Sequence, residues 1–307
     1  MPPLVSIIIP SFNQGKYIRE TIQSCLDQDY RPIEIIVQDG GSKDETLDIV
    51  RSFNCPELTL VVEKDNGVVD AVNKALLRSH GDILTIQSSD DVFLPSAISA
   101  AVATLENNPA YGIVYGDVKH IDSNSTITGE DVQGEFDLLH YLGRFSYIPQ
   151  PGTFFTRNAL NSVKGWRADY SYAADADFWM RIALQYPVYK LHQFVGAYRY
   201  HPEQRDTQKE KIANDWCGLA TDLIRTGKLS FRQRRYARMG MHLANYRYTS
   251  EENWVYRTVE LYSALLSNPI AIFNSQFPKR ELFPGRAPLW SLLSRIKQAI
   301  GLKPRTM

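Results

Sequence analysis

The sequence predicts an α/β fold with a mostly parallel sheet, helices on both faces of that sheet, and a helical C-terminal region. Strand and helix patterns alternate through residues 1–120, and polar residues directly follow three of the strand patterns. From about residue 207 onward, apolar residues recur at helical spacing. The 307 residues suffice for one large domain or two modest ones. We therefore expect an α/β domain over residues 1–206 and a helical region over 207–307.

The first three elements have clear patterns. Residues 4–9 are a β-branched apolar run that ends at Pro10, as expected of a buried strand. Residues 17–26 place their apolar side chains on one helical face. Residues 33–37 are a second strand-like run. A strand, a helix and a further strand in this order are typical of a parallel pair, because parallel strands need a crossover connection.

The next elements continue the alternation. Ser42 and Glu45 form an S-x-x-E pattern, which predicts a capping box at the start of a helix. Residues 58–62 and 83–86 are strand-like runs, and residues 68–77 between them have helical spacing. The alternation therefore extends through a fourth strand.

Beyond residue 90 the pattern changes. Pro95 suits the first turn of a helix that continues over residues 97–105, and residues 111–115 form another strand-like run. Residues 125–200 are richer in aromatic residues and loops, with one clear helix at 175–186.

Polar residues follow three of the predicted strands at the point where each strand ends. Because the carboxyl ends of parallel strands meet at one edge of a sheet, these residues are expected to share the rim where ligands bind. Neither G-x-G-x-x-G nor G-x-x-x-x-G-K-[ST] occurs, which argues against dinucleotide-type and P-loop phosphate sites. The three rim segments are Pro10-Ser11-Phe12-Asn13, Asp39-Gly40-Gly41-Ser42 and Ser88-Ser89-Asp90-Asp91.

Composition narrows the classes of partner. Lys and Arg number 34, as do Asp and Glu, so the formal charge is zero and the chain as a whole does not attract nucleic acid. The 3 cysteines form no C-x-x-C pair, which suits a reducing compartment. No stretch reaches the roughly 18 apolar residues of a membrane span, and the first apolar run lacks a basic leader. We expect a cytoplasmic protein, or one held peripherally at the inner face of a membrane.

Several carboxylates could carry chemistry at the predicted rim. Asp90 and Asp91 repel each other, and Mg²⁺ or Mn²⁺ would relieve that repulsion; the alternative is a solvated loop turn. Asp39 could accept hydrogen bonds from a nucleobase edge, or it could bond its own turn backbone. Each residue alone leaves both interpretations open.

A second group of polar residues lies later in the chain. Asp175 and Asp177 diverge by about 200° on a helix, so one can face a pocket while the other pairs or caps. An aspartate at a helix start is also an ordinary N-cap, whereas beside a pocket it could take a proton from an attacking hydroxyl. His201, in the segment Tyr198-Arg199-Tyr200-His201, could bind a metal or a phosphate, or could serve as a structural hydrogen-bonding residue.

Together these residues resemble a known family. In order, the matching segments are VSIIIPSFNQGKYIRETIQSCLDQDYRPIEIIVQDGGSKDET, EKDNGVVDAVNKALLRSHGDILTIQSSDDVF, GWRADYSYAADADFWMRIAL and YRYH, which span about residues 4–202. The chain is similar to the inverting, nucleotide-sugar-dependent glycosyltransferases of family 2, which have the GT-A fold. The resemblance implies a nucleotide-sugar-binding half over residues 1–120, an acceptor-binding half over 121–206, and a helical region over 207–307.

The resemblance also implies a donor site and a metal. Asp39 would read a uracil-type edge, and Mg²⁺ or Mn²⁺ would be held by Asp90, Asp91 and His201. The family's D-x-D metal motif falls at Ser88 to Asp90 or Ser89 to Asp91, so serine replaces its first aspartate. The residues that match the donor site are Pro10, Phe12, Asp39, Asp70, Asn73 and Asp90.

The implied catalytic base is Asp175, which would take the proton of an acceptor hydroxyl as that hydroxyl displaces the nucleotide in line, with inversion. The glutamate that usually precedes this base is Ala174 here. Asp177 and Trp179 match the D-x-D-x-W pattern that follows, and Gln150 matches the loop that shapes the acceptor site.

The implied partners are a UDP-sugar donor and a saccharide or lipid-linked saccharide acceptor, in surface polysaccharide or glycolipid synthesis. One alternative is a nucleotidyltransferase that makes nucleotide sugars, but such enzymes begin with a glycine-rich phosphate loop where this chain has Pro10-Ser11-Phe12-Asn13-Gln14. Another is a non-catalytic protein that binds a nucleotide sugar or a partner, a reading that the changes at Ser88 and Ala174 keep open.

The C-terminal region adds a possible membrane contact. Four arginines cluster on a predicted helix, at Arg232, Arg234, Arg235 and Arg238. Near the end, five apolar residues share a helical face: Leu289, Leu292, Leu293, Ile296 and Ile300. Trp290, Arg295 and Lys297 flank that face, which is typical of a basic amphipathic helix at an anionic membrane surface. Packing of the same face onto the protein is the alternative.

Overall fold

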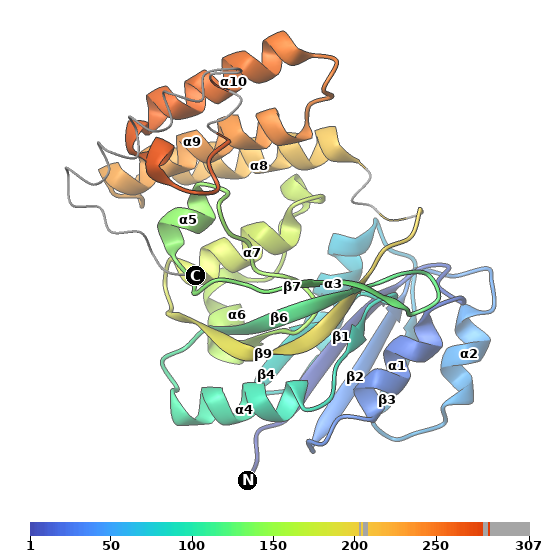
Figure 1. Cartoon of the computed structure of the whole chain (residues 1–307). Helices are drawn as coiled ribbons and strands as arrows, with labels where there is room; N and C mark the ends of the chain where they lie inside the picture. The colour runs from blue at the N-terminus through green and yellow to red at the C-terminus, as the bar shows by residue number, and fades with distance from the viewer. Residues whose placement is uncertain (203, 205–207, 279–281, 283–307) are drawn as a thin grey trace. The chain divides into compact units, whose positions relative to one another are not determined.

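A computed structural model describes residues 1–202, 204, 208–278 and 282 (Figure 1). The chain divides into two compact units. The first, here called the sheet unit, comprises residues 1–138 and 146–207, and the second, here called the helical unit, comprises residues 139–145 and 208–307. Each unit is described by itself.

The sheet unit contains one mixed sheet. Its strand order is β3-β2-β1-β4-β8-β6-β9-β5, with β7 beside β6. Strands β3, β2, β1 and β4 are parallel, whereas β8 is antiparallel to both β4 and β6. The strands are β1 (Val5–Ser11), β2 (Ile33–Asp39), β3 (Leu58–Val62), β4 (Ile83–Ile86), β5 (Val92–Phe93), β6 (Ile113–Ile121), β7 (Ile127–Asp131), β8 (Thr153–Thr156) and β9 (Val188–Arg199).

Helices cover the sheet and confirm the predicted α/β class. Every residue of β1 is buried: Val5, Ile7 and Ile9 join one apolar cluster with side chains of α1 and α4, while Ile8 is buried on the opposite face. Helix α3 packs on β1 and β2, and α7 packs on β6. The helices of this unit are α1 (Ile18–Leu26), α2 (Thr46–Ser52), α3 (Val68–Arg78), α4 (Ala97–Asn107), α6 (Arg157–Val163) and α7 (Ala174–Ala183), with a 3₁₀ turn at Ala168–Tyr170.

The parallel strands end at a common rim, as the sequence predicts. Ser11 at the end of β1 is aligned with Asp39 at the end of β2, and the Gly40 N–H donates to the Ser11 carbonyl at 3.0 Å. On the other side of β1, the Gln87 N–H donates to the Ile8 carbonyl at 2.8 Å. The polar segments after β1, β2 and β4 therefore lie beside one another.

The predicted capping box is wrong. Helix α2 begins at Thr46, and its N-cap residue, Glu45, makes no side-chain cap hydrogen bond. The Thr46 N–H instead donates to the Asp44 carboxylate at 3.1 Å, while the Ser42 hydroxyl donates to Asp39 at 2.7 Å. The Ser42 hydroxyl therefore bonds the Asp39 carboxylate and does not cap the helix in the way that the S-x-x-E pattern predicts.

Residues 125–200, which the sequence predicts to be richer in loops, also contain three strands, β7, β8 and β9. Polar residues interrupt the apolar pattern of β9: Lys190 is buried and pairs with Asp117 at 3.0 Å. Because Lys190 is buried only through its ion pair with Asp117, a residue far away in the chain, its own sequence neighbourhood does not indicate a buried strand. Pro95 precedes α4 and does not lie in its first turn, since Ser96, in the left-handed region at φ 61°, is the N-cap.

The helical unit packs three long helices with shorter ones. They are α8 (Lys209–Arg225), α9 (Phe231–Tyr248) and α10 (Trp254–Ser267), followed by a 3₁₀ helix at Pro269–Phe273, and α5 (Leu138–Leu142) lies almost wholly within this unit. Ser230 and Gln233 form a capping box at the start of α9. Met239, Leu243, Leu261 and Ala264 are central to the apolar core between α9 and α10. The helical character of this region is confirmed up to residue 278.

The C-terminal features divide between described and undescribed residues. The arginine cluster lies on α9, where the Arg235 guanidinium donates to the Ser267 carbonyl at 3.0 Å. The predicted amphipathic segment at 289–300 lies outside the described residues. Through residue 278, no described helix combines the length and the apolar character needed to cross a membrane.

Candidate functional site

Asp39 shapes the rim at the end of β2. Its carboxylate is fully buried and accepts hydrogen bonds from the Gly41 and Ser42 N–H groups at 2.9 and 2.7 Å. The hydroxyl of Ser42 also accepts a bond from the Asn13 N–H at 2.7 Å, which ties the loop after β1 to the turn after β2. Asp39 therefore bonds the backbone of its own turn, which is the alternative to nucleobase binding that the sequence left open.

The other two candidates near the end of β1 differ in exposure. Pro10 is a buried residue of the strand itself, whereas Phe12 exposes 57% of its surface just beyond the strand end. A large apolar ring exposed at a ligand-binding rim offers a stacking surface for a planar ligand. The predicted nucleobase residues thus lie at one rim, with Phe12 as the accessible one.

Asp90 and His201 form the central pair of the site. The Asp90 Oδ2 and His201 Nε2 atoms are 2.9 Å apart, although the residues are 111 positions apart in the chain. The His201 side chain is 4% exposed and the Asp90 side chain 20% exposed. The Tyr17 ring lies 4.9 Å from the His201 ring and holds it from the α1 side. The structure therefore brings together two of the three predicted metal ligands.

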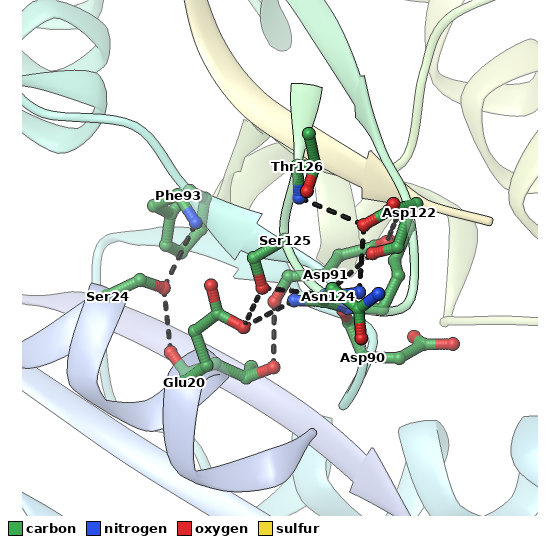
Figure 2. Close-up of polar contacts among 11 residues, drawn as sticks. Glu20, Ser24, Asp90, Asp91, Phe93, Asp122, Asn124, Ser125 and Thr126 are labelled. Carbon is green, nitrogen blue, oxygen red and sulfur yellow. Dashed lines mark hydrogen bonds and ion pairs between the residues drawn. The ribbon is translucent and has the colours of Figure 1, made fainter. Parts of the chain in front are cut away.

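Asp91, the third predicted metal ligand, has a different environment. Its side chain is buried, and its Oδ1 atom accepts the Arg199 N–H at 2.8 Å. Burial raises the pKa of Asp91 well above its ordinary value, and the charge of Asp90 raises it further. In Figure 2 the Asp90 carboxylate extends away from the contacts around Asp91. Asp91 thus fastens this loop to β9, and the pair left at the rim is Asp90 and His201.

The chemistry of this pair fits a divalent cation. A carboxylate oxygen and an imidazole nitrogen are both ligands of Mn²⁺, and Mg²⁺ or Mn²⁺ usually completes its coordination with phosphate oxygens and water. In the described part of the chain, no group of three or more His, Cys, Asp or Glu side chains could hold a metal by itself. A cation at Asp90 and His201 would therefore need ligands from a bound phosphate or from water.

The serine that replaces the expected first aspartate has its own partner. The Gln150 side-chain amide donates to the Ser88 hydroxyl at 3.0 Å. Gln150 comes from the loop before β8, the strand beside β4. The residue predicted to shape the acceptor site thus lies at the same rim as the Asp90–His201 pair.

Asp175 and Asp177 have separate environments, as their spacing predicts. Asp177 is fully buried and accepts hydrogen bonds from the Nε atoms of Arg167 and Arg181, at 3.0 and 2.8 Å. Asp175 is half-buried in the first turn of α7, and the N-cap of that helix is Ala173. Asp177 is therefore the paired carboxylate, and Asp175 is not the N-cap.

Asp70 lies in the first turn of α3. Its Oδ2 atom accepts the Asn66 N–H at 3.0 Å and lies 3.3 Å from the Lys74 ammonium. The hydrogen bond from the Asn66 N–H, aided by Lys74, lowers the pKa of Asp70. Asp70 thus joins the start of α3 to the loop that precedes it.

Asn73, one turn further along α3, bonds a different loop. Its Oδ1 atom accepts the Trp166 N–H and its Nδ2 atom donates to the Trp166 carbonyl, both at 2.9 Å. Arg167, which follows Trp166 in the chain, donates a hydrogen bond to Asp177 on α7. Asn73 therefore supports the approach to α7, a role that the donor-site prediction does not include.

Replacing Asn73 by alanine should lower the free energy of unfolding by about 1–3 kcal/mol, because the N–H and C=O groups of Trp166 lose their paired partner. Chemical unfolding followed by circular dichroism measures this. Asn66→Ala is the matched control, since Asn66 is exposed, and it should change stability by less than about 0.5 kcal/mol. Unchanged stability with weaker nucleotide binding would instead place Asn73 at the donor.

Sequence reasoning missed Arg199 and Tyr17. Arg199 precedes His201 by two residues, and in an extended chain alternate residues face the same side. That period of two could have linked Arg199 to His201. Tyr17 carries no comparable signal, because its contact with His201 joins segments far apart in the chain.

The sequence and the fold are both similar to those of known proteins. The sequence model of the family described as Glycosyl transferase family 2 matches residues 6–164. An uncharacterized glycosyltransferase of Rickettsia prowazekii is 30% identical over 241 residues, which cover 73% of each chain. The chondroitin synthase of Escherichia coli is 26% identical over 69% of this chain, and the match spans 31% of that longer protein.

Solved structures show the same fold. S. aureus TarS residues 1–349, in complex with UDP-GlcNAc, superposes with a TM-score of 0.66 and 18% identity, over 90% of this chain and 82% of that one. A mannosyltransferase of Pyrobaculum calidifontis, in complex with GDP-Man and Mn²⁺, gives 0.61 and 21%, over 99% of this chain and 81% of that one. The expected GT-A architecture is thus confirmed, and the chain belongs to glycosyl transferase family 2.

Proposed function

We propose that this glycosyltransferase moves a sugar from a UDP-sugar to an acceptor hydroxyl in a single, inverting displacement. The observation that carries the proposal is the Asp90–His201 pair, 2.9 Å apart at the rim where β1, β2 and β4 end. That rim is where open α/β sheets bind their ligands. Phe12, exposed at the same rim, supplies a surface for the base.

Asp90 and His201 would hold a divalent cation, Mg²⁺ or Mn²⁺, against the diphosphate of the donor. Such a cation neutralises the negative charge that develops on the leaving nucleoside diphosphate. The pair offers one carboxylate oxygen and one imidazole nitrogen, so the donor phosphates and water would supply the other ligands. Donor and cation would then bind together.

Asp175 would act as the general base. Its carboxylate is half-buried in the first turn of α7. An ionised carboxylate can accept the acceptor's hydroxyl proton as the oxygen attacks the anomeric carbon. One displacement from the face opposite the diphosphate inverts the configuration, and it needs no enzyme nucleophile.

The acceptor would be a saccharide or a lipid-linked saccharide in surface polysaccharide synthesis. Support comes from the relative named chondroitin synthase, a polysaccharide-forming activity by its name. Contact with an anionic membrane through residues 287–307 would bring a lipid-linked acceptor to the enzyme; it remains a prediction from the sequence. The nucleotides bound by the two solved structures differ, so the preference for uridine rests on the family resemblance.

A thermal-shift series with UDP, GDP and dTDP, each with and without Mn²⁺, tests the donor site. A ligand at about 100 times its Kd adds about 2.7 kcal/mol of stability, a rise in Tm of roughly 2 °C or more. We expect the largest rise with UDP and Mn²⁺ together, and little or none for Asp90→Asn. Asp82→Asn, at the opposite end of β4, is the matched control and should respond like the wild type. No shift with any nucleotide would contradict the proposal.

A further inference from the structure

Arg199 is an almost fully buried cation beside the Asp90–His201 pair. Its side chain is 1% exposed, yet a guanidinium stays charged in proteins. It lies at the end of β9, between α1, the loop after β4 and the turn between β6 and β7. Figure 2 shows residues of these segments gathered at one point, among them Glu20, Asp90, Asp122 and Ser125.

The guanidinium of Arg199 joins three separate segments. Its Nε atom donates to the Asp90 carbonyl at 2.6 Å. Its Nη1 atom donates to the Asp122 carbonyl at 3.0 Å and to the Ser125 hydroxyl at 2.9 Å. Its Nη2 atom donates to the Glu20 carboxylate at 2.6 Å, and that carboxylate balances the buried charge. Four of the five guanidinium N–H groups are thus committed to protein atoms.

Arg199 also contacts the neighbours of both Asp90 and His201, which are here called the metal pair. Its backbone N–H donates to the Asp91 carboxylate at 2.8 Å, so Arg199 holds two consecutive residues of the loop that carries Asp90. Its guanidinium lies 4.9 Å from the Tyr17 ring centre, and the same ring lies 4.9 Å from the His201 ring. The carboxylate and the imidazole are therefore both supported by groups that pack on this one side chain.

We infer that Arg199 is a positioning residue that sets the geometry of the Asp90–His201 pair for a divalent cation. The inference rests on the proposed function. Because the side chain is buried and four of its five N–H donors are occupied, it acts through Asp90 and Tyr17 and does not touch the substrate. Groups that orient metal ligands typically alter metal affinity or activity 10- to 100-fold when mutated.

Arg199→Lys tests the inference, because lysine keeps the charge and loses the planar fork of donors. The matched control is Arg157→Lys: Arg157 donates to the Gly81 carbonyl at 2.9 Å and to the Ser79 hydroxyl at 3.0 Å, at the opposite end of β4. Mn²⁺ affinity is measured from the electron paramagnetic resonance signal of free Mn²⁺ at saturating UDP. We expect about 10- to 100-fold weaker Mn²⁺ binding for Arg199→Lys and wild-type affinity for Arg157→Lys.

Two further measurements separate an effect on the metal pair from a general loss of stability: rescue of activity by excess Mn²⁺, and the milder variant Ser125→Ala. If Arg199 acts through the metal pair, excess Mn²⁺ should restore much of the lost activity of Arg199→Lys, which lost folding would not allow. Ser125→Ala removes one partner of Arg199 and should weaken Mn²⁺ binding less; it serves in place of Arg199→Lys if that variant does not fold.

Two results would overturn the inference, and they differ in what they say of the proposed function. Wild-type Mn²⁺ affinity in folded Arg199→Lys would show that Arg199 does not position the metal pair, and it would not contradict metal binding by Asp90 and His201. Absence of UDP-dependent Mn²⁺ binding by the wild-type protein would remove the metal pair as well.

Discussion

Replacing Asp175 by asparagine is expected to lower kcat by about 10²- to 10⁴-fold, the usual contribution of a positioned general base. Asparagine keeps the shape of the side chain and cannot take up the acceptor's proton. The nucleotide site would be unaffected, because its cation pair belongs to the loop after β4 and to His201. Turnover is measured with a UDP-sugar panel, by release of UDP.

The control for this variant is Asp169→Asn, an exposed aspartate in the 3₁₀ turn before α7. It should retain wild-type turnover. Asp175→Asn should also keep the UDP-dependent rise in Tm, which would show that the variant is folded and binds nucleotide. Full turnover by Asp175→Asn would mean that another group accepts the proton.

Replacing Asp177 by alanine is expected to destabilise the sheet unit by about 3–5 kcal/mol. Removing one partner of a buried ion pair leaves the other charge uncompensated, and here two arginines would lose their carboxylate. Arg167 is 33% exposed and can regain some hydration, so we expect the lower end of this range. Denaturant unfolding, with a probe for the sheet unit, measures the change.

An exposed pair provides the comparison for Asp177. Asp48 is 87% exposed and lies 3.4 Å from Arg51 on α2, so Asp48→Ala should cost less than about 1 kcal/mol. Equal effects for the two variants would contradict the structural role given to Asp177. Two aspartates separated by one residue would thus affect different quantities: turnover for Asp175 and stability for Asp177.

The parallel part of the fold could be predicted closely because its strands are continuous apolar runs. Strands β3 and β4 match their predicted ranges at both ends, and β1 and β2 extend two residues further at the rim. Strand β6 begins within the predicted range 111–115 and extends beyond it. Strands β7, β8 and β9 were missed, and in β9 the buried Lys190 depends on a distant partner, Asp117. Strand β5, at two residues, is too short to leave a periodic signal.

The site could be predicted only as a set of residue types. The sequence indicated Asp90 and His201 as metal ligands, but it could not distinguish Asp90 from Asp91. In the structure the Asp90 carboxylate contacts the His201 ring nitrogen, whereas the Asp91 carboxylate accepts the Arg199 backbone N–H. Similarly, the sequence allowed the Ser42 hydroxyl to bond either the Asp39 carboxylate or the start of α2, and in the structure it bonds Asp39. Such choices between partners depend on three-dimensional distance, which spacing along the chain does not encode.

The separation between Asp90 and His201 has a consequence for synthesis of the protein. The four neighbouring parallel strands β1 to β4 are encoded before residue 87, so that part of the sheet can pair while the rest of the chain is still being made. At about 5–20 residues per second, the 111 positions that follow Asp90 take roughly 6–22 s to translate. A nascent chain would therefore gain cation-dependent nucleotide binding only late, and that binding could report when the sheet unit is complete.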